Sequence, residues 1–323
     1  MFKIFYKFFF LFSILTHTQL FSQNTYPSKS LKLIVPFATG GAADLVARLV
    51  ADEMSKRLGQ TVFVENKPGA AGNIGTHQVA QSDPDGYTLL LGFDGTMVIN
   101  PHIYPRLTFN SIRDFAPIGK IGDVPLLLVS NVSLASKNLT DLIELSKKQS
   151  GGISYGTAGT GSTQHLMIEL LNQKSGSNFV HIPYKGASPA MTDVMGGHLS
   201  LVGAALAGSL EYIKAGKLKA FVISSSTRSK YLVDVPTFAE LGLGDMVITA
   251  WHGLLAPSKT PQAVIKKLNA ALNSILIEQD LIDKLDVIGS IASPGTPEKF
   301  ADQIKNDLEK YDQIVKLAKI KIE

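Results

Sequence analysis

The stretch LKLIVPFATGGAADLVARLVADEMSKRL, residues 31–58, decides the fold class. It opens with an apolar run of strand length, continues with a polar, glycine-rich loop at 36–44, and then repeats apolar residues at helical spacing. A strand, loop and helix in this order form one unit of an α/β protein. The first turn of such a helix has unpaired backbone N–H groups, which favour an anion. The stretch therefore predicts an α/β fold with an anion-binding loop after its first strand.

Strand-like and helix-like segments alternate along the rest of the chain, which predicts parallel sheets covered by helices. Further strands are predicted at 61–65, 87–91, 125–129, 179–182, 199–202, 218–223 and 247–250. Two helices are predicted near the C-terminus, at 261–288 and 297–318. Thr260-Pro261 and Thr296-Pro297 precede them, so Thr is expected at each N-cap and Pro at each first helical position.

The length of 323 residues is enough for two lobes with separate cores. We predict that lobe 1 comprises residues 23–123 and 250–323, and that lobe 2 comprises residues 124–249. The chain would then cross between the lobes twice, near 122–124 and near 250–253. No linker rich in Pro, Gly and Ser separates the two parts, which favours a hinge over independent domains.

Residues 1–22 are predicted to be a signal peptide, which places the mature protein in the periplasm. Lys3 and Lys7 supply positive charge, and the apolar run at 8–15 is too short to span a bilayer, which takes roughly 20 apolar residues. An uncleaved N-terminal anchor is the alternative. Removal of 1–22 leaves 31 − 2 = 29 basic residues against 27 acidic ones. This excess is too small to indicate a nucleic-acid partner.

The sequence offers little for catalysis or for metal binding. It contains no cysteine, so disulfides, thiol catalysis and Cys-ligated metals are excluded. Neither G-x-S-x-G nor H-E-x-x-H occurs, and the seven histidines lack metal-ligand spacing. We expect no cofactor, no metal and no enzymatic activity.

Three polar, glycine-rich loops follow predicted strands, at 36–44, 92–96 and 156–163. Ligands of open α/β sheets bind at the carboxyl ends of strands, so these loops are candidate walls of a binding cleft. Ordinary turns capped by Ser or Thr are the alternative for any one loop. The third loop has Ser162 where a phosphate-binding P-loop needs Lys, and the first loop is not G-x-G-x-x-G. Nucleotide binding is therefore not expected.

At these loops the sequence resembles the Bug family, the solute-binding receptors of tripartite tricarboxylate transporters. The resemblance runs from about residue 26 to the C-terminus. It is carried by LIVPFATGGAADLVAR (33–48), VENKPGAAGNIGT (64–76), DPDGYTLLLG (83–92), INPHIYP (99–105), YGTAGTGSTQHL (155–166), HIPYKGASPAMTDVMGGH (181–198), AGKLKA (215–220), DVPTFAELG (234–242) and WHGLLAPSKTP (251–261). It implies a type II periplasmic binding protein, with two α/β lobes joined by a two-crossing hinge around a ligand cleft.

The resemblance also implies ligand-binding residues in both lobes. The first loop would hold a ligand carboxylate through Phe37, Ala38, Thr39, Gly40, Gly41 and Asp44. The second would add Asp94, Gly95 and Thr96. The lobe 2 loop would contribute Gly156, Thr157, Thr160, Gly161, Ser162 and His165. Lys185 is a further candidate anion ligand, with a solvated lysine beside a turn as the alternative.

Two departures from the family pattern bear on the ligand. Polar residues commonly found after one lobe 2 strand are replaced by Gly203-Ala204-Ala205, so Ala204 would line the cleft without a polar group. The second loop is usually neutral but here contains Asp94. An ionised Asp94 in the cleft would repel a carboxylate, by roughly 4 kcal/mol at 4 Å, and favour an ammonium or hydroxyl. A helix-capping role is the alternative.

The function predicted from the sequence is capture of a small organic acid or amino-acid-like ligand by lobe closure, followed by delivery to the membrane permease subunits of a tripartite tricarboxylate transporter. The receptor is expected to be a monomer. Two alternatives have other partners or chemistry: a ligand-loaded sensor that engages a signalling protein, and an exported hydrolase or isomerase.

Overall fold

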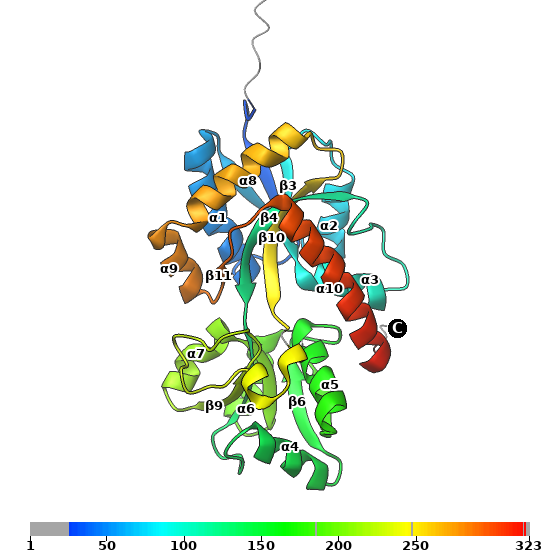
Figure 1. Ribbon diagram of the computed structural model, residues 1–323, viewed down its shortest axis with the longest axis vertical. Coiled ribbons are helices and arrows are strands. Elements are labelled where there is room, and N and C mark those ends of the chain that lie inside the picture. Colours follow the sequence, from blue (N-terminus) through cyan, green and yellow to red (C-terminus); the bar gives the residue numbers. More distant parts are fainter. Residues whose placement is uncertain (1–25, 185, 247, 319, 321–323) are drawn as a thin grey trace, which may run out of the picture.

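The computed structural model describes residues 26–184, 186–246, 248–318 and 320. The predicted signal peptide lies outside these residues. Two mixed sheets, one in each lobe, are stacked along the long axis of the molecule (Figure 1). We call lobe 1 the sheet with strand order β11-β4-β10-β3-β1-β2 and its helices, and lobe 2 the sheet with order β7-β6-β8-β5-β9 and its helices. The fold therefore confirms the two α/β lobes.

In lobe 1, the strands are β1 (Leu31–Val35), β2 (Val62–Asn66), β3 (Thr88–Phe93), β4 (Phe115–Val124), β10 (Ala250–Pro257) and β11 (Ile291–Ala292). Its helices are α1 (Ala42–Leu58), α2 (Asn73–Ala80), α3 (Asn100–Ile103), α8 (Gln262–Leu276), α9 (Gln279–Val287) and α10 (Pro297–Ala318). A π-helical turn, η2 (Gly95–Ile99), follows β3, and a 3-10 turn, η1 (Ala70–Gly72), precedes α2.

In lobe 2, the strands are β5 (Leu126–Asn131), β6 (Ile153–Thr157), β7 (Phe179–Pro183), β8 (Leu201–Ala205) and β9 (Leu218–Ile223). Its helices are α4 (Leu139–Lys148), α5 (Thr163–Ser175), α6 (Ala187–Met195) and α7 (Leu206–Lys214). The 3-10 turns η3 (Ala239–Leu241) and η4 (Gly244–Met246) precede the return to lobe 1.

The two crossings between the lobes are continuous with the sheet of lobe 1. Strand β4 ends at Val124 and β5 of lobe 2 begins at Leu126, while β10 begins at Ala250 on the way back. Within lobe 1, β10 pairs antiparallel with both β4 and β3. The sheets are therefore mixed, and the expectation of parallel sheets was wrong, because β10 and β11 in lobe 1 and β5 in lobe 2 run antiparallel to their neighbours. The exact boundaries of the two lobes remain a proposal.

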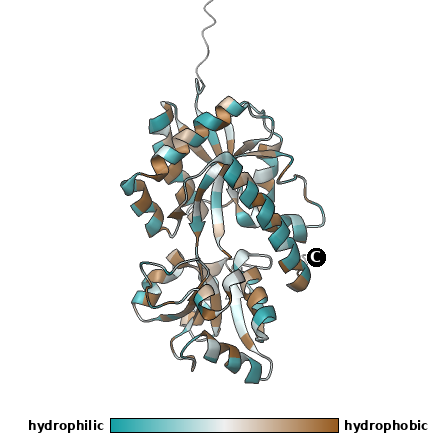
Figure 2. Ribbon diagram, viewed as in Figure 1, coloured by the Kyte–Doolittle hydropathy of each residue, from teal (hydrophilic) through white to brown (hydrophobic). Residues whose placement is uncertain are grey.

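Two separate cores and one shared core hold the lobes. One cluster packs β1, β3, α1, α8 and α9 within lobe 1, and another packs β5, β8, α6 and α7 within lobe 2. The third cluster continues from lobe 1 to lobe 2 through Met97, Trp251, Tyr311 and Leu166. Helix α10 lies across this junction and packs against both β4 and α5 (Figure 1). Much of α10 is hydrophilic on the side seen in Figure 2, so its apolar residues are turned to this shared core.

Of the two helices predicted near the C-terminus, one begins as predicted and the other begins one residue late and is divided in two. Helix α10 begins at Pro297, and the Lys299 N–H donates to Thr296 Oγ1 at 3.2 Å, which confirms the predicted Thr-Pro start. Helix α8 begins one residue later than predicted, with Pro261 at the N-cap and no side-chain cap. The predicted helix at 261–288 is two helices, α8 and α9, because the chain turns between Leu276 and Gln279.

Candidate functional site

The loop at 36–44 joins β1 to α1 at the carboxyl end of the strand. Gly41 is at the N-cap of α1 and makes no side-chain cap, so the first turn of a 17-residue helix has no polar side chain on its N–H groups. Residues 38–42 are exposed. An exposed helix N-terminus without a cap has the geometry and the partial positive charge that an anion requires.

Asp44 organises this loop from within. Its side chain is 1% exposed, and its carboxylate accepts hydrogen bonds from the Gly40 N–H at 2.9 Å, Arg48 Nε at 3.0 Å and Asn66 Nδ2 at 2.9 Å. Burial alone would raise the pKa of Asp44, but these hydrogen bonds and the Arg48 charge lower it. Asn66 also donates to the Phe37 carbonyl at 3.0 Å and accepts from Thr39 Oγ1 at 3.1 Å. Asp44 therefore shapes the loop, and its oxygens are occupied.

The loop at 69–72, which was not predicted to be part of the site, lies against the loop at 36–44, where a Cβ at Gly72 would contact Pro36 and Phe37. Ala70 and Ala71 adopt left-handed backbone angles, with φ of 46° and 51°. Such angles cost energy for a residue with a Cβ and often occur at functional sites. Thr96 Oγ1 and Asn100 Nδ2 both donate to the Ala71 carbonyl at 3.1 Å. The motif KPGAAG at 67–72 was the only feature of the sequence that pointed to this loop, and its composition does not indicate alanines with left-handed backbone angles.

An aromatic row connects the first loop with the hinge. The Phe37 and Phe93 rings meet edge to face at 5.5 Å, and Phe93 lies 5.6 Å from His252 of the hinge strand β10. Burial lowers the pKa of His252 to about 4, so this histidine is neutral at pH 7. The floor of lobe 1 behind the loop is therefore apolar and uncharged at these three rings.

The loop at 156–163 is the corresponding feature of lobe 2. Ser162 caps α5 through its side chain, which accepts from the His165 N–H at 3.4 Å. His165 Nδ1 accepts from the Gly161 N–H at 3.1 Å. Thr157 Oγ1 lies 2.7 Å from His181 Nε2. Thr160 is the exposed side chain of this loop, while Gly156 and Thr157 are buried beneath it.

Two stacked histidines support this loop from below. The rings of His165 and His181 are 3.8 Å apart and nearly parallel, and Tyr155 lies beside them with its hydroxyl donating to Glu169 at 2.6 Å. Burial lowers the pKa of His165 to about 3 and that of His181 to about 4. Both rings are therefore neutral hydrogen-bonding groups. Ser162 and His165 do not form a nucleophile–base pair, because the Ser162 hydroxyl accepts from the His165 N–H and the His165 ring accepts from the Gly161 N–H.

Asp94 does not have either of the two roles considered from the sequence. It has helical backbone angles and makes no side-chain cap. Its side chain is also fully buried, so it presents no atom to solvent in the cleft. Instead, Asp94 Oδ2 accepts a hydrogen bond from Thr163 Oγ1 of lobe 2 at 2.6 Å. Burial raises the pKa of Asp94 to about 7.

Two other predicted residues lie away from the loops or outside the described chain. Ala204 is fully buried in the core of lobe 2, on β8 opposite Leu127 of β5. Lys185 lies outside the described residues. On lobe 1, Thr96 thus bonds to the loop at 69–72, which lies beside the loop at 37–44, and on lobe 2 the residues from Gly156 to His165 form one loop and the start of α5.

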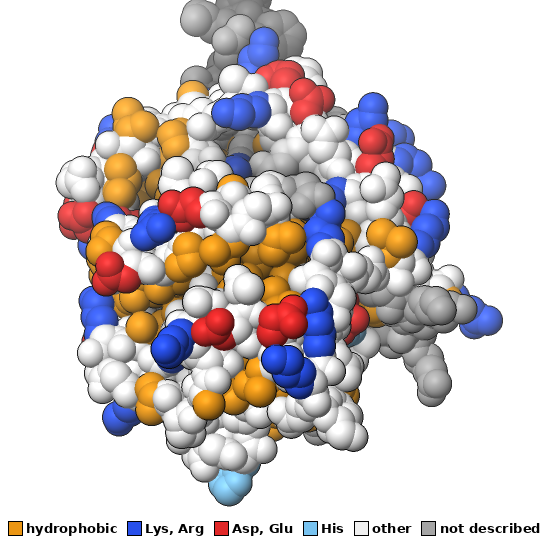
Figure 3. Space-filling view, turned by 60° about the horizontal axis from the view of Figure 1, so that its bottom comes forward, with side chains coloured by type: hydrophobic (Ala, Val, Ile, Leu, Met, Phe, Trp, Pro, Cys, Tyr) orange, Lys and Arg blue, Asp and Glu red, His pale blue; other side chains and the backbone are white. Residues whose placement is uncertain are grey.

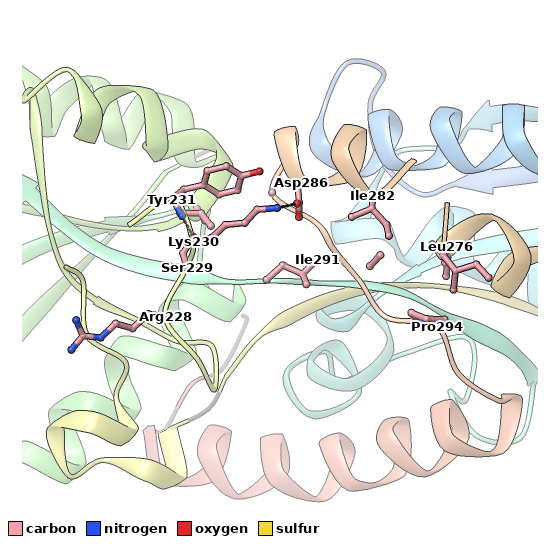
Figure 4. Close-up of a pocket in the computed structure, with 13 residues that line it drawn as sticks. Arg228, Ser229, Lys230, Tyr231, Leu276, Ile282, Asp286, Ile291 and Pro294 are labelled. Carbon is pink, nitrogen blue, oxygen red and sulfur yellow. Dashed lines mark hydrogen bonds and ion pairs between the residues drawn. The ribbon is translucent and has the colours of Figure 1, made fainter. Parts of the chain in front are cut away.

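A separate groove of about 550 Å³ lies between the lobes beside β11. Its lining is mostly apolar and includes Leu206 of lobe 2 and Ile277, Ile282 and Ile291 of lobe 1. In the space-filling view, apolar side chains gather across the middle of one face with charged residues around them (Figure 3). In the close-up, Lys230 reaches Asp286 across the groove, and Arg228 points away from it (Figure 4). Strands β4 and β10 separate this groove from the loops after β3 and β1.

No described helix is long and apolar enough to cross a membrane. Within the same described ranges, no group of three or more His, Cys, Asp or Glu residues is arranged to hold a metal ion. Each lobe instead has a polar, glycine-rich loop that leads into a helix, α1 in lobe 1 and α5 in lobe 2, and the chain crosses between the lobes next to β4 and β10. These features define a two-lobed solute-binding protein.

The chain belongs to the tripartite tricarboxylate transporter family of receptors, whose sequence model matches residues 46–319. It is 38% identical to the UPF0065 protein in the TAR-I ttuE-ttuC' intergenic region of Agrobacterium vitis, over 91% of this chain and 86% of that protein. It is 34% identical to Protein BugT of Bordetella pertussis, over 91% of both chains. The resemblance to Bug proteins is thereby confirmed, and the chain is a solute-binding receptor.

Solved structures agree with this assignment. A structure described as a periplasmic transporter is 41% identical, with a TM-score of 0.82 over 92% of this chain and 100% of that one. Rpa4515 of R. palustris, solved with adipate, is 30% identical, with a TM-score of 0.83 over 92% and 100%. MatC (Rpa3494) of Rhodopseudomonas palustris, solved with bound malate, is 31% identical, with a TM-score of 0.78 over 90% and 100%.

Proposed function

We propose that this receptor captures a small carboxylate-bearing molecule between the loops at 37–44 and 156–163 and delivers it, unchanged, to a membrane permease. The uncapped N-terminus of α1 carries this proposal. Residues 38–42 are exposed, and Asp44 fixes the loop through the Gly40 N–H. The other N–H groups at the start of the helix offer partial positive charge to one carboxylate. The loop at 156–163 would close over the ligand from lobe 2, with Thr160 as its exposed hydroxyl.

The position of Asp94 changes what is expected of the ligand. In the sequence, an acid in the second loop argued against a second carboxylate. Because the Asp94 side chain is fully buried and bonded to Thr163, it presents no charged surface to the ligand. A dicarboxylate is therefore compatible with the cleft. Adipate and malate, present in two solved relatives, are the first ligands to test.

Membership of the family supports a location and a partner for this chain. We infer that residues 1–22 direct export, that the mature chain works as a monomer in the periplasm, and that its partners are the permease subunits of a tripartite tricarboxylate transporter. Ser162 and His165 are already engaged in fixing their own loop. This supports a receptor that does not transform its ligand, with no cofactor.

The experiment is a calorimetric titration with C4 to C6 dicarboxylates, tricarboxylates, aromatic acids and amino acids. Its structural arm uses Ala42, the first residue of α1, which is exposed. Ala42→Glu places a negative charge at the proposed carboxylate site. We expect at least a tenfold loss of ligand affinity, since two like charges about 4 Å apart repel by several kcal/mol. The same charge favours the helix itself, so Tm should not fall.

Ala42→Gln is the matched control, because it has nearly the same size without the charge. It should keep the affinity within about threefold of the parent. Equal losses in Ala42→Glu and Ala42→Gln would show that bulk, not charge, matters there. Absence of binding by every carboxylate at millimolar concentration, together with binding of a neutral or cationic solute, would overturn the proposal.

A further inference from the structure

Asp94 lies where both lobes, the hinge and the C-terminal helix meet. It follows β3 of lobe 1, and its carboxylate accepts the hydroxyl hydrogen of Thr163, the first residue of α5 in lobe 2, at 2.6 Å. Both side chains are buried, with 0% and 1% exposure. Thr163 is the last residue of the lobe 2 loop at 156–163, and Asp94 directly precedes Gly95 and Thr96. One hydrogen bond therefore joins the two lobes at the ends of their candidate ligand loops.

The surroundings of Asp94 are built from the hinge and α10. Trp251, on the hinge strand β10, donates its indole N–H to Asp307 of α10 at 2.9 Å. Tyr311 lies one turn further along α10 and is fully buried in the core that the two lobes share. Asp94 and Asp307 are close enough for the charge of each to raise the pKa of Tyr311. No Lys or Arg of the described chain pairs with Asp94 by salt-bridge distance.

A buried acid without a cation is costly, and an apolar residue would fill the same space at lower cost. The cost at Asp94 is partly offset by the Thr163 hydroxyl and by the backbone N–H groups of Gly95 and Trp251, which favour its charged form. Asp94 Oδ1 has no hydrogen-bond partner of good geometry. What the carboxylate adds to the fold, and an apolar side chain cannot, is the bond across the lobes.

We propose that Asp94 is a positioning residue for ligand capture, which acts through Thr163 to hold the lobe 2 loop opposite the lobe 1 loop. The expected effect on affinity rests on the proposed function, whereas the expected effect on the distance between the lobes does not. Asp94 itself does not touch the ligand. Its substitution therefore weakens binding by letting the two loops separate, and Thr163→Val produces the same loss.

The test compares Asp94→Ala, Thr163→Val and the double variant with Asp94→Asn, which keeps an oxygen acceptor for Thr163. The chain has no cysteine, so spin labels can be attached at Lys56→Cys on α1 and Lys147→Cys on α4, both exposed. Pulsed electron paramagnetic resonance then reports the distance between the lobes without any ligand. Adipate titration by calorimetry reports affinity, with malate in its place if malate alone binds.

The distance distribution should be narrow in the parent and in Asp94→Asn, and broad in Asp94→Ala and Thr163→Val. Affinity should fall about tenfold in each of the two single variants, as for loss of a buried hydrogen bond, and the double variant should lose no more than either. This non-additivity is expected when two residues act through one bond.

Two results would overturn the inference. Equal distance distributions in all variants would show that the bond does not position the lobes. A loss of affinity in Asp94→Ala with none in Thr163→Val would assign Asp94 to direct ligand contact. Failure of the carboxylate ligand would leave the distance measurement unaffected, so the two proposals fail separately. If Asp94→Ala does not fold, Thr163→Val and Asp94→Asn still decide the outcome.

Discussion

Lys230 of lobe 2 and Asp286 of α9 in lobe 1 form an ion pair across the groove beside β11 (Figure 4). The hinge strands β4 and β10 separate this pair from the loops that face the proposed ligand. If the lobes rotate about the hinge so that the ligand cleft narrows, the groove on the other side of the hinge must widen. The width of the groove and the width of the cleft are therefore coupled, and a constraint between Lys230 and Asp286 should change ligand binding.

A cross-link across the groove tests this linkage. Lys230→Cys with Asp286→Cys, joined by a short bis-maleimide, should change the association rate or the affinity for the carboxylate ligand at least tenfold, because a fixed lobe angle removes the transition that accompanies capture. Stopped-flow and calorimetric measurements before and after cross-linking check this.

The control for the cross-linking experiment uses Asp280→Cys with Lys284→Cys, an ion-paired couple within α9 alone. The same reagent on this pair should leave binding unchanged. Unaltered kinetics after cross-linking at 230 and 286 would mean that capture does not require the lobes to move.

Asp44 should be needed for both the stability and the affinity of the receptor. Asp44→Ala leaves the Gly40 and Asn66 donors without their acceptor, and we expect a loss of about 1–3 kcal/mol in the free energy of unfolding. The loop at 37–44 would lose its shape, so ligand affinity should fall at least tenfold. Urea denaturation and calorimetry measure the two effects.

Asp52→Ala on the same helix is the matched control for Asp44→Ala. The Asp52 side chain is 69% exposed and pairs with the exposed Lys56, so a change below about 0.5 kcal/mol is expected. Since the pKa of Asp44 is lowered in the folded state, its contribution should be present above about pH 4 and lost as the pH falls further. A pH-independent difference between Asp44→Ala and the parent, from pH 7 down to pH 2, would contradict this assignment.

Much of the fold could be predicted because local patterns agree with the tertiary structure. The strands at 31–35 and 218–223 and the helix at 297–318 have the predicted bounds. The long strand β4 was missed, since Pro117, Gly119 and Gly122 in its interior are typical of loops. Its partners β10 and β11 are distant in sequence, and pairing with them overrides this local signal. The predicted strand at 247–250 was wrong, because the strand begins at Ala250.

In the candidate site, the positions of the loops could be predicted from the sequence, but the partners of individual side chains could not. Glycine-rich loops after strands predict the places where a ligand meets the backbone, and the structure gives those loops the expected positions. The partners of individual side chains depend on segments far away in the chain. Asp94 finds Thr163 at a separation of 69 residues, and Asp44 finds Asn66 at 22. No local pattern contains this information, so neither the burial of Asp94 nor the buried position of Ala204 could be predicted.

The stacked pair of His165 and His181 should make stability depend on pH. Their pKa values in the folded state are about 3 and about 4, whereas an unfolded histidine titrates near 6.5. Below pH 6.5 the unfolded chain therefore binds protons that the folded chain does not, and stability falls as the pH decreases toward 4. Between pH 7 and 5 the loss should be on the order of 2 kcal/mol for each residue.

The double variant His165→Asn with His181→Gln keeps an acceptor for Gly161 and a donor for Thr157 without a titrating ring. Its unfolding free energy should vary less with pH between 6.5 and 4.5 than that of the parent, as measured by urea denaturation at several pH values. His198→Gln, at an exposed position, is the control and should leave the slope unchanged. A slope in the double variant equal to that of the parent would show that the acid sensitivity has another source.

Gly289 should tolerate no side chain, because its backbone is packed against lobe 2. A Cβ there would lie 2.5 Å from the Cβ of Ala207 in α7, and φ is +71°. Gly59, at the end of α1, has φ of +66° and no atom within 4 Å of its missing Cβ. Gly59→Ala therefore measures the backbone cost alone, about 1 kcal/mol. Gly289→Ala should cost about 1–3 kcal/mol more, through the clash between the lobes.

Ala207→Gly in the background of Gly289→Ala removes the opposing methyl group and should recover part of this additional loss, which urea denaturation of Gly59→Ala, Gly289→Ala and this double variant would show. The clash lies on the groove side of the hinge, next to Lys230 and Asp286. Gly289→Ala should therefore also alter ligand affinity, whereas Gly59→Ala should not. Equal unfolding free energies for Gly59→Ala and Gly289→Ala would mean that the lobes are not in contact at Gly289 in solution, and that the groove between them is wider than in this structure.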